Sequence, residues 1–283
     1  MKLQEGLQQG LHAYRPESDE PLVLAFDTAT AACAAALLQG DRVLAEVQSL
    51  AERNHSVNIV PQLQELLRTS GVSGSSLTGI AVGLGPGSYT GVRIAVTAAK
   101  TLAWVWDKPL VGVSSLEQLA LGGYWSEAER EVRSAERAWL VPLMDARRGQ
   151  VYTAAFAAAP DGWHRLAEDR IRLMQDWREE LLRQLEDVAE GAAGEEQPSS
   201  VVFTGDPSLH LEEIEAFAQL AGERWPELRV EVRAHVAEGR WAGLLGAVRL
   251  LAGERDAAHD LVPNYTQLAE AEAKLLARAR EGS

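Results

Sequence analysis

The order of apolar and polar positions along the chain predicts the same succession of elements twice. Each half begins with three short apolar runs, which alternation and turn residues mark as strands, and continues with a helical stretch and further strand–helix pairs. The first runs, Leu22–Asp27 and Trp139–Asp145, both end in an aspartate. Each half therefore reads β-β-β-α-β-α-β-α, and the shared order indicates a duplication.

The predicted segments have similar lengths in the two halves. Those of the first half are Leu22–Asp27, Cys33–Leu38, Arg42–Val47, Asn54–Thr69, Gly79–Val82, Thr90–Trp106, Pro109–Val113 and a helix that Ser115 caps. Those of the second half are Trp139–Asp145, Gln150–Ala158, Trp163–Ala167, Asp176–Val188, Val201–Thr204, Leu211–Leu220, Leu228–Val232 and Val236–Leu251. Three meandering strands followed by βα units predict an α/β fold with mixed sheets, flanked by helices on both faces.

The same pattern divides the chain into four parts. We expect a polar tail (1–20), a first unit (21–121), a second unit (138–262) and a terminal helix that packs back on the rest (263–283). The charged stretch Tyr124–Arg137 and the small, polar stretch Gly191–Ser200 are interpreted as insertions on the surface. Two such units side by side predict a cleft between them.

Composition narrows the class of protein. The chain has 283 residues, 46% apolar and 24% charged, which is typical of a globular protein and excludes disorder throughout. No apolar run is long enough for a membrane span, and residues 1–20 lack the apolar core of a secretory signal. The single Cys33 excludes an intrachain disulfide and is expected in the core, so we predict a cytoplasmic protein. A formal charge of −14 argues against a broad nucleic-acid-binding face.

A glycine-rich turn, Gly83–Gly91, lies between a predicted strand and a predicted helix. Glycines there expose backbone N–H groups toward an anion, which makes Gly85 and Gly87 weak candidates for cofactor binding. The dinucleotide motif fails at Ser88, and no P-loop lysine follows. Two interpretations therefore stay open, a ligand loop and a tight turn that lets elements pack closely.

The two strand-end aspartates are the remaining candidates for chemistry. In two-lobed ATPases such a carboxylate holds a magnesium-bound water, and a glycine follows within two residues so that phosphate can approach. Here Ala29 and Ala146 stand in that region, which favours a turn-capping role for Asp27 and Asp145. The six histidines have no metal-binding spacing and no Gly-x-Ser-x-Gly elbow occurs, so we predict no metal site and no catalytic residue.

Several strings together carry a family resemblance. They are Asp27-Thr28, Arg53-Asn54-His55-Ser56, Gly85-Pro86-Gly87-Ser88-Tyr89-Thr90-Gly91-Val92-Arg93-Ile94, Gly112-Val113-Ser114-Ser115-Leu116 and Asp145-Ala146-Arg147-Arg148-Gly149-Gln150-Val151-Tyr152. The chain closely resembles the TsaB (YeaZ) family of bacterial tRNA threonylcarbamoyladenosine biosynthesis proteins. The resemblance implies two tandem ribonuclease-H-like units with mixed five-stranded sheets, the fold of the actin-like ATPases.

The resemblance also implies a function. Members of the family are non-catalytic scaffold subunits that pair with TsaD, which transfers threonylcarbamoyl to the adenosine next to the tRNA anticodon, and the ATPase TsaE joins them. ATP and metal would then belong to the partner subunits, with no cofactor bound tightly by this chain and tRNA reached only through the complex. A homodimer is the alternative assembly for the isolated chain, and an active ATPase or kinase of the actin-like fold is the alternative function.

The family's pairing surface is formed by the first two helices of the first unit. In this chain they are Asn54–Thr69 and Thr90–Trp106, and both carry apolar residues on more than one side. Because a surface helix needs one apolar stripe for its own core, we expect part of this surplus to be exposed for the partner. The candidate interface residues are His55, Val57, Ile59, Val60, Leu63, Arg93, Ile94, Ala98 and Leu102.

Overall fold

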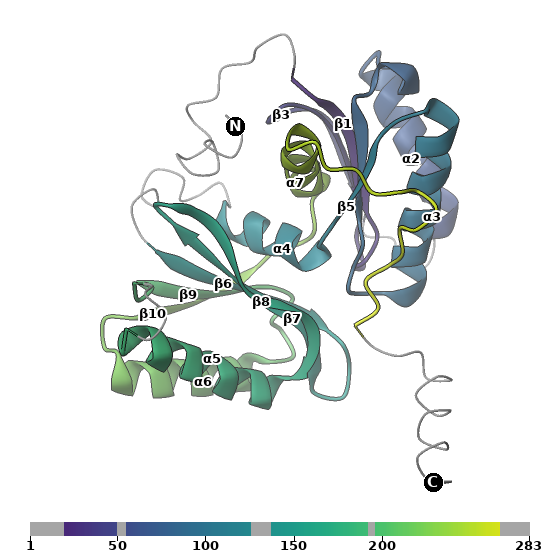
Figure 1. The fold of residues 1–283 in the computed structure, drawn as a ribbon. Helices are drawn as coiled ribbons and strands as arrows, with labels where there is room; N and C mark the ends of the chain where they lie inside the picture. Colours follow the sequence, from purple (N-terminus) through teal and green to yellow (C-terminus); the bar gives the residue numbers. More distant parts are fainter. Residues whose placement is uncertain (1–19, 50–54, 126–136, 192–195, 267–283) are drawn as a thin grey trace, which may run out of the picture.

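The protein contains two five-stranded mixed sheets of the same topology, as Figure 1 shows. This computed structural model describes residues 20–49, 55–125, 137–191 and 196–266. The strand orders β3-β2-β1-β4-β5 and β8-β7-β6-β9-β10 are equivalent, which confirms the predicted fold class and the repeated order of elements. Nearly all of the predicted tail and of the predicted terminal helix lies outside the described residues.

The first sheet combines an antiparallel meander with two parallel strands. β1 pairs antiparallel with β2 and parallel with β4, and every residue of β1 after Leu22 is buried because helices cover both faces of the sheet. The elements of this half are β1 (Leu22–Asp27), β2 (Cys33–Gln39), β3 (Arg42–Ser49), α2 (His55–Thr69), β4 (Gly79–Gly83), α3 (Tyr89–Trp106), β5 (Leu110–Val113) and α4 (Ser115–Tyr124). Cys33 is fully buried, as predicted.

The second sheet repeats this arrangement with a longer hairpin. β8 runs to Leu173, beyond the predicted Ala167, because its outer half continues the pairing with β7. The elements are β6 (Ala138–Asp145), β7 (Gln150–Ala159), β8 (Gly162–Leu173), α5 (Met174–Ala189), β9 (Ser200–Gly205), α6 (Leu211–Arg224), β10 (Arg229–Ala234) and α7 (Gly239–Leu251). No helix within the described ranges is long and apolar enough to span a bilayer.

The two halves of the chain exchange their last helices. α2 and α3 cover one face of the first sheet, and the other face is covered by α7, which comes from the second half. In the second sheet, α5 and α6 cover one face, and α4 from the first half covers the other. Figure 1 shows α4 and α7 between the two sheets, and the two helices are in contact. A cleft of about 550 Å³ remains beside them, lined by residues of both halves that include Glu117, Trp163 and Arg249.

Small residues let α7 lie directly on the first sheet. A Cβ added at Gly246 would stand 2.3 Å from the Cβ of Ala81, and one at Gly239 would stand 2.3 Å from the carbonyl carbon of Ala35. At such distances no side chain fits, so glycine is required at both positions. The chain after α7 then returns along the first unit, where the Nζ of Lys100 donates to the carbonyl oxygens of His259 and Leu261 at 3.2 and 3.1 Å.

Candidate functional site

The carboxylate of Asp27 is enclosed where β1 ends. Its Oδ2 accepts hydrogen bonds from the Ser115 hydroxyl at 2.5 Å and from the Gln118 amide at 2.7 Å, and Oδ1 accepts from the backbone N–H of Ala29 at 2.6 Å. Only 2% of the residue is exposed. Two of the three donors belong to α4, so the helix that crosses to the second sheet also closes the end of the first.

The Ser115 hydroxyl is free to bond Asp27 because a different residue caps α4. The prediction that Ser115 is the N-cap was wrong: the cap is Ser114, whose hydroxyl accepts from the N–H of Glu117 at 3.1 Å. Ser115 therefore begins the helix with its side chain turned toward Asp27. Gln118 follows three residues later, on the same face of the helix.

Burial changes the acidity of the enclosed group. Removal of the Asp27 carboxylate from water raises its pKa above the usual range, and the hydrogen bonds from Ser115 and Ala29 oppose that rise. A Cβ at Gly83 would stand 1.9 Å from Oδ2, so the neighbouring strand fills the remaining space. Both oxygens of this buried carboxylate already accept hydrogen bonds from the protein, so these residues do not fit the metal–phosphate group of an ATPase.

The glycine-rich turn is bonded to the same strand end. The N–H of Gly85 donates to the Ser115 hydroxyl at 3.0 Å, and the N–H of Ser88 donates to the Ala29 carbonyl at 2.7 Å. A Cβ at Gly87 would stand 2.4 Å from that same carbonyl oxygen. The backbone N–H groups of Gly85 and Ser88 therefore already have hydrogen-bond acceptors within the protein. This favours the interpretation of the two glycines as a tight turn for close packing over a phosphate-binding loop.

The start of α3 makes the closest approach in this region. The Thr28 hydroxyl donates to the Gly91 carbonyl at 2.6 Å, and a Cβ at Gly91 would stand 1.9 Å from the Thr28 carbonyl oxygen. The helix therefore begins against the backbone that follows β1. Together these contacts pack the end of β1, the glycine-rich turn and the start of α3 closely against one another.

The corresponding carboxylate of the second half is open to solvent. Asp145 is exposed where β6 ends, and its Oδ1 accepts from the N–H of Arg147 at 2.9 Å. The Nε2 of His210 lies 3.8 Å from the same oxygen, too far for a hydrogen bond. The two aspartates that the sequence aligns therefore have different surroundings.

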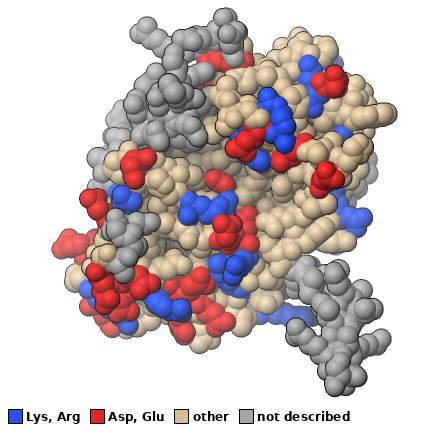
Figure 2. Space-filling model, viewed as in Figure 1, with Lys and Arg blue, Asp and Glu red and all other residues tan. Residues whose placement is uncertain are grey.

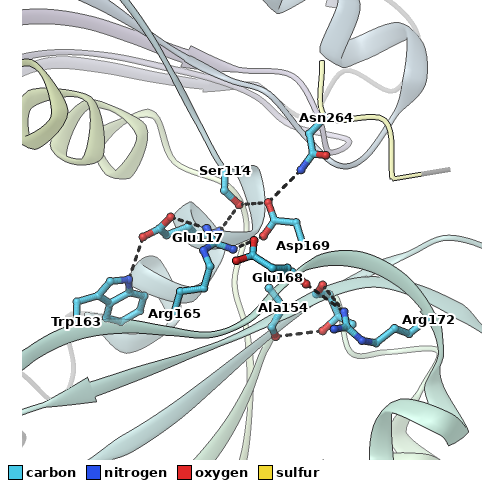
Figure 3. A network of polar contacts seen from close by, with 10 residues as sticks. Ser114, Glu117, Ala154, Trp163, Arg165, Glu168, Asp169, Arg172 and Asn264 are labelled. Carbon is cyan, nitrogen blue, oxygen red and sulfur yellow. Dashed lines mark hydrogen bonds and ion pairs between the residues drawn. The ribbon is translucent and has the colours of Figure 1, made fainter. Parts of the chain in front are cut away.

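Polar side chains connect the two units across the cleft, as Figure 3 shows. Arg165 of β8 pairs with Glu117 of α4 at 2.8 Å and with Asp169 at 2.6 Å. Asp169 also accepts from the Ser114 hydroxyl at 2.6 Å and from the Asn264 amide at 3.3 Å. The network thus joins both units and the returning chain after α7.

The charged groups of this network stabilise one another, because Arg165 is paired with both acids. Burial raises the pKa of Glu117, and the Arg165 guanidinium opposes that rise. Burial lowers the pKa of Arg165, but the neighbouring charges of Asp169 and Glu117 outweigh it and hold the value above the usual range. Arg165 also lies over the ring of Phe156, with 4.6 Å to its centroid. The arrangement fixes the units relative to each other.

The predicted partner surface lies on α2 and α3. A groove of about 440 Å³ runs between the two helices and is lined by Ile59, Val60, Tyr89, Thr90, Arg93, Ile94, Thr97 and Ala98. Val60 is 41% exposed, and Arg93 is exposed and lies over the Tyr89 ring at 5.2 Å. Leu102 and Ala98 are half-buried.

Other candidate interface residues lie elsewhere. Ile59 and Leu63 are 1% exposed and belong to the core under α2. Fewer apolar residues of this helix are therefore exposed for a partner than the sequence pattern predicted. The side chains of His55 and Val57 lie outside the described residues. Among the described residues, the most exposed large apolar side chain is Trp104, 78% exposed near the end of α3, and the adjacent Val105 is also exposed.

Comparison with known proteins places the chain among tRNA-modification proteins. The family model described as "TsaD: tRNA N6-adenosine threonylcarbamoyltransferase" matches residues 46–274. The chain is 36% identical over 255 residues to the tRNA threonylcarbamoyladenosine biosynthesis protein TsaB of Bacillus subtilis, covering 89% of this chain and 96% of that protein. It is 39% identical over 143 residues to TsaB of Escherichia coli, covering 50% of this chain and 58% of that protein.

Solved structures agree in fold. A Pseudomonas aeruginosa protein described as uncharacterized, with similarity to peptidase YEAZ, superposes with a TM-score of 0.63 at 25% identity. That comparison covers 87% of this chain and all of the other.

Proposed function

The chain belongs to the TsaB (YeaZ) family, and from this premise we propose that it serves tRNA threonylcarbamoyladenosine biosynthesis as a non-catalytic subunit. In this proposal it pairs with the transferase TsaD, the ATPase TsaE joins the pair, and tRNA is bound through the assembled complex. Threonylcarbamoyl transfer to the adenosine beside the anticodon is then the work of TsaD, and this chain supplies a binding surface.

The enclosure of Asp27 is the observation that carries the non-catalytic role. A working ATPase of this fold needs its first-strand carboxylate free to hold a hydrated metal ion. Here that carboxylate is 2% exposed and receives donors from Ser115, Gln118 and Ala29. This arrangement counts against the alternative of an active ATPase or kinase.

The groove between α2 and α3 supports the pairing. The family model that matches most of this chain is that of the transferase itself, so both partners would present an equivalent pair of helices. Two such pairs can form a four-helix contact, with the half-buried Ala98 allowing close approach. The exposed Val60 and Trp104 would supply apolar area on this face.

Calorimetry with ATP and magnesium tests the non-catalytic role. We expect the purified chain to show neither ATP hydrolysis nor tight ATP binding, because the carboxylate and the glycine turn are occupied by protein groups. A dissociation constant in the micromolar range, which corresponds to a binding free energy of about −8 kcal/mol, would contradict the proposal.

Charge substitution tests the pairing surface. Val60→Glu and Ala98→Glu are expected to lower the affinity for TsaD at least tenfold with a near-normal melting temperature, because an unpaired charge would be buried in the contact. Leu220→Glu on α6 is the matched control, since Leu220 is 36% exposed on a helix of the other unit. If both groove variants fold and bind TsaD normally, the pairing surface lies elsewhere.

A further inference from the structure

The turn between β6 and β7 contains two consecutive arginines in left-handed backbone. The φ angles are 67° at Arg147 and 54° at Arg148, and Gly149 follows with 72°. Residues with a Cβ adopt this conformation at a cost of about 1 kcal/mol each, and hairpin turns usually place asparagine and glycine there. The chain thus has two long cationic side chains where smaller residues would be more stable.

Both side chains are available to a ligand. Arg147 and Arg148 are exposed, and neither guanidinium has a hydrogen bond or ion pair within the described part of the chain. Some other exposed arginines on helices do have acidic partners, such as Arg68 with Glu65 at 2.6 Å. The turn itself is held firmly, because the N–H of Met174 donates to the Gly149 carbonyl at 3.0 Å.

A hollow adjoins this turn where two helices begin. Its volume is about 650 Å³, and it is lined by Gly149, Leu173, Met174, Gln175, Ser208, Leu209, His210, Leu211, Glu212 and Glu213. These residues include the first turns of α5 and α6, and neither helix has a side-chain hydrogen bond at its N-cap. Free N–H groups at helix N-termini attract anions.

A buried histidine lines the same hollow. His210 is 5% exposed, and its Nε2 has no hydrogen-bond partner within the described residues. A buried imidazole nitrogen without a partner is costly, so a ligand atom that reached it would restore a hydrogen bond. The turn, the two helix ends and His210 therefore converge on one place.

We propose that this place, the turn Arg147–Arg148 with the adjoining hollow, contacts phosphate groups of the tRNA backbone. The inference rests on the proposed function, since the complex that forms around TsaD must hold tRNA. Arginine is suited to this contact because its guanidinium donates two parallel hydrogen bonds to a phosphate. The contact carries no sequence information and serves to position the RNA.

Neighbouring acids oppose the binding of any phosphate, and this repulsion matters most for a free phosphate, which nothing else holds at the site. Glu212 and Glu213 line the hollow, and Asp145 lies 3.8 Å from His210. Figure 2 shows acidic side chains gathered over the part of the surface where α5 and α6 lie. These charges would repel a small anion in solution. A phosphate on an RNA that the complex already holds has a high local concentration, so two weak contacts become effective.

The test uses the double variant Arg147→Asn/Arg148→Gly in the complex with TsaD. This change removes both charges and gives the turn the residues that left-handed backbone favours. We expect tRNA affinity of the complex to fall about tenfold, with a salt slope lower by one to two. The melting temperature of the variant should be unchanged or higher, which loss of a structural role would not produce.

A matched control separates a local contact from a change in net charge. Arg183→Gln/Arg224→Gln removes two exposed charges from α5 and α6 at positions distant along the helices from the turn, and we expect it to leave tRNA affinity within twofold. Equal weakening by the control would overturn the inference in favour of a general charge effect. Titration of the isolated chain with inorganic phosphate is the second arm, and millimolar binding that the variant abolishes would assign the site to free phosphate.

The outcome also distinguishes this inference from the proposed function. Gel filtration of the same samples reports whether the chain and TsaD assemble. An assembled complex whose tRNA affinity does not change in the turn variant overturns the inference alone. Failure of the wild-type chain to assemble with TsaD overturns the proposed function and with it the inference.

Discussion

The ends of β1 and β6 are equivalent in topology and opposite in chemistry. Asp27 is enclosed by α4, the glycine turn and the start of α3, whereas Asp145 lies open beside a turn that presents two arginines. The difference comes from what surrounds each carboxylate, since the strands and their pairing are the same. The strand end is packed in one unit and accessible to solvent in the other.

Alanine at one glycine beside each strand end should give the largest contrast. Gly91→Ala puts a Cβ 1.9 Å from the Thr28 carbonyl oxygen, so the backbone must separate, and we expect a loss of about 4 kcal/mol or failure to fold. Gly149→Ala meets no atom within 4 Å and costs only the left-handed conformation, about 1 kcal/mol. Urea unfolding followed by circular dichroism measures both, and equal losses would show that the two ends are packed alike.

Removal of each carboxylate should give the next largest difference. Asp27→Ala leaves the donors of Ser115 and Gln118 without an acceptor in a buried place, and we expect a loss of about 3 kcal/mol in the free energy of unfolding. Asp145→Ala removes an exposed side chain and should cost less than about 1 kcal/mol. A similar cost for both, in the same denaturation assay, would contradict the enclosure of Asp27.

A third prediction uses pH and His235, which packs on α4 from the second unit. A Cβ at Gly122 would stand 1.9 Å from the His235 Nε2, and burial, with the nearby charge of Arg240, lowers the pKa of this imidazole to about 4. The unfolded chain binds a proton near pH 6.5, so stability is full above that value and is lost as pH falls toward 4. Between pH 7 and pH 4.5 we expect a loss of about 2 kcal/mol from this group.

His235→Gln isolates that contribution. The variant should lose less stability than the wild type over the same pH interval, as measured by denaturant unfolding at each pH. His164→Gln, at an exposed position, is the control and should follow the wild type. An unchanged pH dependence in His235→Gln would mean that the imidazole is hydrated in the folded protein.

The enclosed Asp27 should respond to pH in the opposite sense. Its pKa is raised in the folded protein, so the folded state retains a proton that the unfolded chain releases above about pH 4. Its contribution to stability is therefore full below that value and decreases as pH rises through the folded pKa. Asp27→Asn should flatten this part of the profile relative to the wild type, and Asp145→Asn should not.

The elements of the fold could be predicted because each has a local signal. Apolar runs of Val, Leu and Ala marked β1 and β6, and three- and four-residue spacing marked α2. Their boundaries agree with the structure within a few residues, except in β8, whose outer half consists mostly of Glu, Asp and Arg, has no fully buried residue and so lacks an apolar pattern.

The exchange of α4 and α7 could not be predicted from the order of elements. Both helices follow the last strand of their own half, and a periodic pattern shows that a helix has a buried face without showing which sheet covers it. The glycines of α7 were a signal of close packing, since Gly239 and Gly246 recur on a helix otherwise rich in Leu and Val.

The site was predictable only in part for a related reason. Asp27, Gly85 and Gly87 were recognisable from their places at a strand end and in a turn, and the structure brings all three together. Gln118 gave no signal, because its role depends on the path of α4 past β1. The backbone of Arg147 and Arg148 was equally hidden, since arginine carries no preference for left-handed conformation.

The exchange of helices also sets the order in which the protein can be completed during synthesis. The first sheet is finished only when α7 covers it, and α7 ends at Leu251, after every strand of both sheets has left the ribosome. Until then the face formed by Val23, Ala25 and Val111 has no cover. Such long-range closure makes folding slow and couples the two units in one cooperative transition, so neither half expressed alone should fold as an independent domain.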